Sequence, residues 1–160
     1  NTSKQEADKE GFMIKTEFMA LAVENAKKAA LAGEVPVGAV IVKGDKIIAE
    51  GYNKREAKQN ALSHAETEAI SSACERLSSW RLDGCEMYVT LEPCSMCAGT
   101  IMNARIDRVV FGAYDEKGGA MGGVCNLCEM PFMNKPQVIG GFMEKECAAV
   151  LSYFFEALRD

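Results

Sequence analysis

The sequence contains no apolar run that approaches the roughly 18 residues needed by a membrane-spanning helix. Its first residues lack the apolar core of a signal peptide, and no repeat or low-complexity segment interrupts the chain. These absences predict a protein without a membrane segment, which we expect to work in the cytoplasm.

Positive charge is also scarce, because 18 lysines and arginines stand against 23 aspartates and glutamates, for a net charge of −5 at pH 7. General nucleic-acid binders are more often basic, so this composition argues against that class. Local basic patches can still contact RNA, since short-range contacts tolerate an acidic remainder.

The composition of the chain is typical of one globular domain, with 160 residues of which 48% are hydrophobic and 26% charged. Residues 1–12 are polar and aperiodic, whereas a helix-like pattern begins directly after Met13. We therefore expect a single domain over 13–160, preceded by a disordered or expression-derived prefix over 1–12. Seven cysteines, an odd number that includes two Cys-x-x-Cys pairs, favour reduced thiols and metal over disulfides.

Apolar periodicity divides the chain into alternating helices and strands. Helices are predicted over 16–32, 63–79, 93–104 and 144–158, and strands over 37–42, 46–52, 87–91, 108–113 and 137–140. Gly44-Asp45 predicts a two-residue hairpin turn. Ser63 is the expected N-cap of the second helix, and Phe154 and Phe155 are expected to face inward. Since helices alternate with strands, we predict an α/β fold, a three-layer α/β/α sandwich around one five-stranded mixed sheet.

The only histidine of the chain lies in His64-Ala65-Glu66, and the segment Pro93-Cys94-Ser95-Met96-Cys97 follows further along. Three protein ligands, with a fourth tetrahedral position left to water, are typical of a catalytic rather than a structural zinc site. His64, Cys94 and Cys97 supply such a ligand set, and Glu66 remains to carry protons. This pattern is the known signature of zinc nucleobase deaminases. We therefore predict one zinc ion per chain and Glu66 as the catalytic residue.

Both ligand segments lie at predicted helix starts, which makes their convergence plausible in physical terms. Side chains of a first helical turn lean toward the N-terminal end, so His64 and Glu66 can meet one ion there. Cys94 and Cys97 are three positions apart and share a helix face. The partial positive charge of a helix N-terminus lowers the pKa of a thiol and favours the thiolate that zinc requires.

Two other functions remain open from the residues alone. Cys94-x-x-Cys97 and Cys125-x-x-Cys128 could form a structural four-cysteine zinc site in a non-enzymatic binding module, although the 27 residues between the pairs exceed the usual loop. Otherwise Cys125 and Cys128 are expected to be buried small apolar residues, as are Cys74, Cys85 and Cys147. The catalytic site could also deaminate a free base or nucleotide of the guanine or cytosine type.

From about Thr16 to Arg159 the chain resembles the bacterial tRNA-specific adenosine deaminases of the cytidine-deaminase-like superfamily. The resemblance is carried by GEVPVGAVIV (33–42), SHAE (63–66), the long segment 79–123 and CAAVLSYFFEALR (147–159). It implies the cytidine-deaminase-like fold and zinc-dependent hydrolysis of adenosine to inosine at the wobble position of a tRNA anticodon loop. It also implies a homodimer, for which the apolar residues in or beside the ligand-bearing helices are candidates: Leu62, Met96, Ile101 and Met102.

The resemblance further implies a set of substrate-binding residues. Asn53 would hydrogen-bond the base, and Ala65 would offer a backbone contact in the pocket. Asp115 and Asn126 occupy substrate-loop positions of the family. Candidate phosphate contacts are the basic residues that flank the zinc-bearing half: Arg105, Arg108, Lys117 and Lys135.

Two segments depart from the family pattern. Lys135 follows Asn134 where relatives commonly carry a histidine, so an imidazole expected at the substrate mouth is missing. The loop before the histidine, residues 59–63, lacks the Asp-Pro-Thr of many relatives. Both departures concern the contacts with substrate and leave the predicted zinc ligands intact.

Overall fold

The computed structural model describes residues 13–159, so the prefix predicted over 1–12 lies outside the described residues. Five strands form one mixed sheet in the order β2-β1-β3-β4-β5. β1 pairs antiparallel with β2 and β3, whereas β3 and β4, and β4 and β5, are parallel. The strands are β1 (Gly38–Lys43), β2 (Lys46–Tyr52), β3 (Cys85–Leu91), β4 (Arg108–Ala113) and β5 (Gln137–Ile139). The predicted five-stranded mixed sheet is confirmed.

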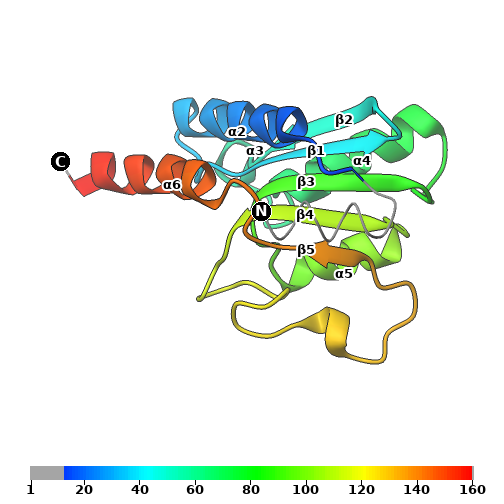
Figure 1. The fold of residues 1–160 in the computed structure, drawn as a ribbon. Coiled ribbons are helices and arrows are strands. Elements are labelled where there is room, and N and C mark those ends of the chain that lie inside the picture. The colour runs from blue at the N-terminus through cyan, green and yellow to red at the C-terminus, as the bar shows by residue number, and fades with distance from the viewer. Residues whose placement is uncertain (1–12, 160) are drawn as a thin grey trace.

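Helices cover both faces of this sheet and complete the three predicted layers (Figure 1). Helices α2 (Thr16–Leu31) and α6 (Glu144–Arg159) pack on one face, and α4 (Ala65–Leu77) packs on the other, where it contacts α5 (Ser95–Asn103). A short helix α3 (Arg55–Lys58) follows β2, and a 3-10 turn η1 (Leu127–Glu129) lies in the long connection between β4 and β5.

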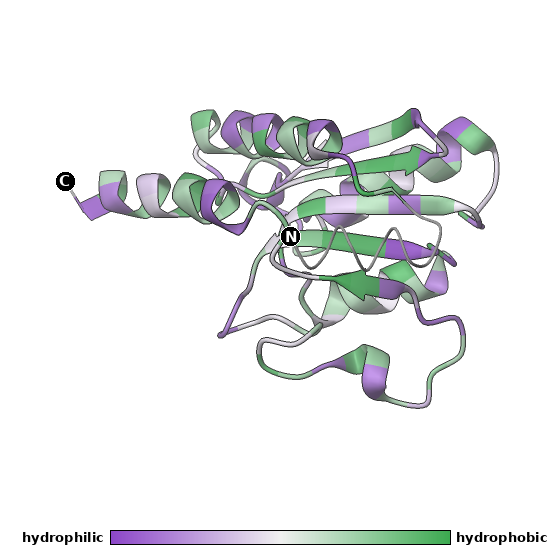
Figure 2. Cartoon of the chain, viewed as in Figure 1, coloured by the Kyte–Doolittle hydropathy of each residue, from purple (hydrophilic) through white to green (hydrophobic). Residues whose placement is uncertain are grey.

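Strand periodicity explains how one sheet serves two cores, because successive side chains point to opposite faces. On β1, Ala39 and Ile41 belong to the core under α4 and α5, whereas Val40 and Val42 belong to the core under α2 and α6. All four are almost completely buried. Hydrophobic colours accordingly run along the central strands in Figure 2. The sheet is therefore closed to solvent on both faces, and chemistry is confined to its edges and strand ends.

The helix that carries the histidine begins later than predicted. His64, not Ser63, is the N-cap of α4, because its backbone is extended and its N–H donates to the Thr67 hydroxyl at 3.0 Å. Ser63 itself is buried. The His64 side chain therefore leaves from the cap of α4, whereas Glu66 lies in its first turn. The Gly44-Asp45 hairpin between β1 and β2 is confirmed.

Helix α6 differs from the prediction in its exposed second half. Figure 1 shows the helix extending past the sheet toward the C-terminus. Phe155 is 42% exposed, and Tyr153 and Leu158 are exposed more strongly, so the expected inward orientation is wrong for Phe155.

Within residues 13–159, no helix is both long and apolar enough to cross a membrane.

Candidate active site

The starts of α4 and α5 meet beside the C-terminal end of β3, at Leu91. The parallel strand β4 ends beside it, at Ala113. His64 caps α4, Cys94 caps α5, and Cys97 lies in the first turn of α5. The Nδ1 atom of His64 is 3.6 Å from the Sγ atoms of both Cys94 and Cys97. Their ligand atoms all lie within 4.8 Å of one another, the only such group of three among the described residues.

This geometry fits a tetrahedral zinc ion. Zinc–sulfur bonds of about 2.3 Å and zinc–nitrogen bonds of about 2.0–2.1 Å, joined at a tetrahedral angle, separate the two donor atoms by roughly 3.6 Å. The observed distances match that value for both cysteines. His64, Cys94 and Cys97 form the zinc-binding triad of the chain.

The two thiols have opposite proton affinities. Hydrogen bonds from Cys97 and, less strongly, from His64 outweigh the opposing effect of burial and lower the pKa of Cys94 to about 4. The hydrogen bond to Cys94, together with burial, raises the pKa of Cys97 above its ordinary range. One thiolate is thus formed readily, and the other thiol loses its proton only when a cation takes the proton's place.

Glu66 lies beside this triad with only 4% of its surface exposed. Burial raises the pKa of this carboxyl to about 7, and the negative charge of Cys94 acts in the same direction. A carboxyl in such surroundings binds and releases a proton more easily near neutral pH than an exposed glutamate does.

A small pocket of about 150 Å³ opens over these groups. Four residues expected from the sequence line it, namely Asn53, Ala65, Glu66 and Asp115, together with the ligands His64 and Cys94. Its volume is below the roughly 300–1,000 Å³ of pockets that enclose drug-sized ligands. The space therefore suits a single planar group inserted from outside rather than a whole nucleotide chain.

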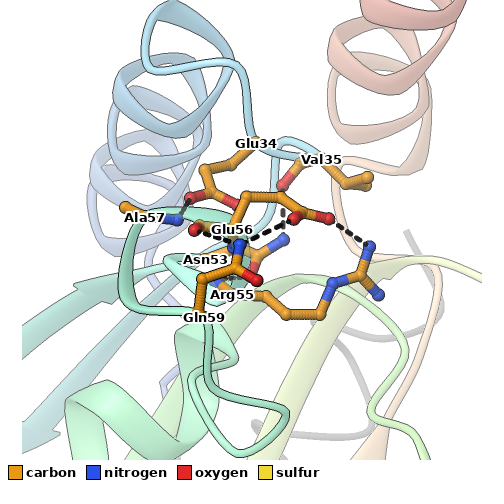
Figure 3. Close-up of polar contacts among 7 residues, drawn as sticks. All are labelled: Glu34, Val35, Asn53, Arg55, Glu56, Ala57 and Gln59. Carbon is orange, nitrogen blue, oxygen red and sulfur yellow. Dashed lines mark hydrogen bonds and ion pairs between the residues drawn. The ribbon is translucent and has the colours of Figure 1, made fainter.

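A buried carboxylate that sequence reasoning missed shapes one wall of the pocket. Figure 3 shows Glu34 facing the start of α3, where its two oxygens accept the backbone N–H groups of Glu56 (2.9 Å) and Ala57 (2.7 Å). Asn53 completes this wall, because its Oδ1 accepts from Arg55 N–H at 3.1 Å and its Nδ2 donates to Val35 O at 3.2 Å. The second Nδ2 hydrogen of Asn53 remains for another acceptor.

Other candidate residues lie outside the pocket lining. Lys117 and Asn126 belong to the connection after β4 that also carries Asp115, and Asn126 caps η1 by accepting from Cys128 N–H. Arg105 follows the far end of α5, where it donates to the carbonyls of Met102 and Asn103. These three residues are not brought together with the zinc ligands within one chain.

One expectation from the basic residues is wrong, and another stays a prediction. Arg108 is completely buried and forms an ion pair with Glu86, so it is not available to a phosphate. Lys135 and Asn134 line a surface depression with Arg105, away from the catalytic pocket. Neither residue lines the catalytic pocket, and the predicted phosphate contact of Lys135 stays a prediction.

The cysteines outside the triad also differ in part from expectation. Cys85 and Cys147 are buried as expected, whereas Cys74 and Cys128 are half-buried and Cys125 is exposed. Neither Cys125 nor Cys128 joins a group of three ligands among residues 13–159, so the four-cysteine structural site is not formed. No disulfide joins any of the seven cysteines.

The three-layer fold, the histidine–cysteine–cysteine triad and the buried glutamate together define a zinc deaminase of the cytidine-deaminase-like class. The family of MafB19-like deaminases matches residues 13–159. A tRNA-specific adenosine deaminase of Bacillus subtilis is 48% identical over 143 residues, which are 89% of each chain. With this similarity over nearly the full length, the chain belongs to the tRNA-specific adenosine deaminase family.

Solved structures agree with this assignment. A structure from work on A-to-I editing by tRNA:A34 deaminases at the wobble position is 41% identical, with a TM-score of 0.81, over 86% of this chain and all of that one. A guanine deaminase of Bacillus subtilis is 37% identical with a TM-score of 0.61, over 77% of this chain and 79% of that one. The fold thus also accommodates a free-base deaminase.

Proposed function

We propose that this chain converts adenosine to inosine at the wobble position of a tRNA anticodon loop, by zinc-dependent hydrolysis. The observation that carries the proposal is the convergence of His64, Cys94 and Cys97 beside buried Glu66, at the base of a pocket large enough for one base. The similarity to tRNA-specific adenosine deaminases over about nine-tenths of the chain supports the choice of substrate.

An unpaired loop nucleotide is well suited to this pocket. An enzyme that acts on a base must take it out of the stack, and the energy required is smallest for a base that is already single-stranded. Because the pocket is small, the base enters while the sugar and phosphates remain at the surface. Asn53 would then donate its remaining Nδ2 hydrogen to the base, and the backbone of Ala65 would contact it.

Glu66 carries the protons of the reaction in this proposal. When bound to the triad, zinc acidifies water enough for attack near neutral pH. Glu66 accepts a proton from the attacking water and delivers it to N1 of the purine. It next moves the remaining hydroxyl proton to the amino group on C6, which leaves as ammonia. Water and adenosine are thereby converted to ammonia and inosine without any other reactant.

The phosphate contacts and the oligomeric state belong to the same proposal. Lys117 lies in the loop that carries Asp115, so it can reach a phosphate beside the inserted base. Arg105 and Asn126 would contribute where a second copy completes the RNA site.

A homodimer can use exposed Leu62 and half-buried Met96. Ile101 and Met102 are buried in the core and are not available, contrary to the sequence prediction. The absence of disulfides supports a reducing compartment, the cytoplasm.

The decisive experiment compares substrates. The protein is incubated with an anticodon stem-loop that contains a wobble adenosine, with the same loop carrying guanosine there, and with free guanine and free cytidine. Ammonia released only from the adenosine stem-loop supports the proposal. Release of ammonia from free guanine instead would favour the second candidate function, guanine deamination. The observation that supports this candidate is the similarity to the guanine deaminase of Bacillus subtilis.

A further inference from the structure

A second buried carboxylate lies beside the zinc-ligand segment. Glu92 stands between the end of β3 and Cys94 and is only 2% exposed. Its Oε1 accepts from the backbone N–H of Asp115 at 3.0 Å, and its Oε2 accepts from Met121 at 2.9 Å and Gly123 at 2.8 Å. All three donors belong to the loop that follows β4. Hydrogen bonds to a charged acceptor are the strong ones, so this carboxylate holds the loop in one conformation.

Backbone contacts join the same loop to the ligand segment itself. The N–H of Glu92 donates to Ala113 O at 2.8 Å, and the N–H of Ala120 donates to Pro93 O at 2.9 Å. Cys94 and Gly119 form an isolated antiparallel bridge. Residues 114–123 therefore lie against the segment that leads to the metal ligands, with the Glu92 carboxylate between them.

The glycines of this loop make room for that carboxylate. A Cβ atom on Gly119 would overlap the Glu92 carboxylate, and its three nearest atoms all belong to Glu92. A Cβ atom on Gly123 would lie 2.7 Å from Glu92 Oε1 and would also overlap the Asp115 carbonyl. The loop can therefore pack against the Glu92 carboxylate only because positions 119 and 123 carry no side chain.

We propose that Glu92 is the positioning residue of the substrate loop. By holding the backbone of Asp115, Met121 and Gly123, it fixes the loop that carries the pocket-lining residue Asp115. Both of its oxygens are occupied by backbone donors, so it acts through the loop and takes no proton from the substrate. The inference rests on the proposed function for its effect on catalysis, but the effect on the loop is independent of that function.

Amide hydrogen exchange tests the loop directly. In Glu92→Ala, the amides of Asp115, Met121 and Gly123 lose their acceptors and should exchange much faster, while the amides of β4 keep their protection. In Glu92→Gln one carbonyl oxygen remains but an NH₂ group faces a backbone donor, so an intermediate loss is expected. Unchanged protection of the three amides in both variants would overturn the proposal, whatever reaction the protein catalyses.

Steady-state kinetics on the adenosine stem-loop tests the consequence for substrate. KM should rise about tenfold in Glu92→Ala, because buried donors are left unsatisfied in the pocket wall, and less in Glu92→Gln. Zinc content should stay at about one per chain, and kcat should fall much less than KM rises. A fall in kcat with unchanged KM would instead place Glu92 in the chemical step and contradict the proposal.

A second pair of variants separates positioning from general destabilisation. Gly119→Ala should raise KM in the native chain but have little further effect in the Glu92→Ala background, because the overlapping carboxylate is gone. If the two substitutions raise KM additively, Gly119 and Glu92 do not act through the same contact, which would contradict the proposal.

Glu86→Gln is the matched control, since it weakens a buried ion pair at the opposite end of β3. It should lower the Tm and leave KM unchanged. If the native chain does not deaminate the stem-loop, the proposed function fails while the exchange experiment still decides the role of Glu92.

Discussion

The Nδ1 atom of His64 lies 3.6 Å from the Sγ atom of Cys94, although 30 positions separate the two residues in the chain. This distance is the one that a shared tetrahedral zinc ion imposes on nitrogen and sulfur ligands. The starts of α4 and α5 therefore place the ligand atoms at the separation that a shared zinc ion requires.

The metal content of variants tests this ligand set. We expect about one zinc per chain, lost in His64→Ala because one of three protein ligands is removed. The double variant Cys125→Ser, Cys128→Ser should keep its zinc, since neither residue joins the triad. Elemental analysis of the purified proteins measures both. Loss of zinc from the double variant with retention in His64→Ala would restore the structural four-cysteine interpretation.

Proton transfer is tested separately from metal binding. Glu66→Ala should keep zinc and the fold yet lose activity by roughly 10²–10⁴-fold or more, because a positioned acid and base is removed. Ammonia release under saturating stem-loop, with zinc measured in the same samples, provides the readout. Deamination at nearly the native rate would remove Glu66 from the mechanism.

The zinc ligands could be predicted from the sequence because their spacing is local. His-x-Glu and Cys-x-x-Cys each fit within one helical turn, and Pro93 indicated where α5 begins. Strand boundaries were predicted closely for the same reason, since alternation and the Gly44-Asp45 turn are features of neighbouring residues. Local patterns thus determined the elements and the metal ligands together.

The two buried carboxylates Glu34 and Glu92 could not be predicted in the same way. Their partners are backbone N–H groups 22 to 31 positions further along, and a backbone donor leaves no mark on residue type. Burial of Arg108 also depended on distant pairing, because Glu86 stands opposite it only in the parallel register of β3 and β4. Without that register, a surface position for an arginine was the natural expectation.

The pair of Arg108 and Glu86 makes a prediction about stability. Glu86→Ala leaves a buried guanidinium without this partner, so the free energy of unfolding should fall by about 3 kcal/mol. Glu24→Ala is the control, because the exposed pair of Glu24 and Lys27 should contribute less than about 1 kcal/mol. Urea unfolding of both variants gives the comparison. Equal losses would show that the buried position of Arg108 has no energetic consequence.

The homodimer prediction concerns mass in solution. A twofold pair buries the same patch on both chains, so exposed Leu62 and half-buried Met96 would be covered together. Light scattering at micromolar concentration should give about twice the 17.4 kDa of one chain, and Leu62→Glu should shift it toward the monomer. A native protein that scatters as a monomer would contradict the dimer.

The last prediction separates phosphate contacts from base contacts through salt. Each phosphate neutralised on a single strand contributes about −0.7 to the slope of log affinity against log salt. Lys117→Ala should therefore weaken binding of all loop sequences about equally and flatten that slope by up to about 0.7. Asn53→Ala should lower adenosine turnover and leave the slope unchanged, since its amide faces the base pocket. Arg108→Lys should not alter the slope either, because its side chain is buried. Binding is followed by fluorescence anisotropy of a labelled stem-loop over a series of salt concentrations. A native slope near zero, with equal turnover of stem-loop and free base, would mean that the protein recognises the base alone, and a free-base deaminase would then replace the tRNA enzyme.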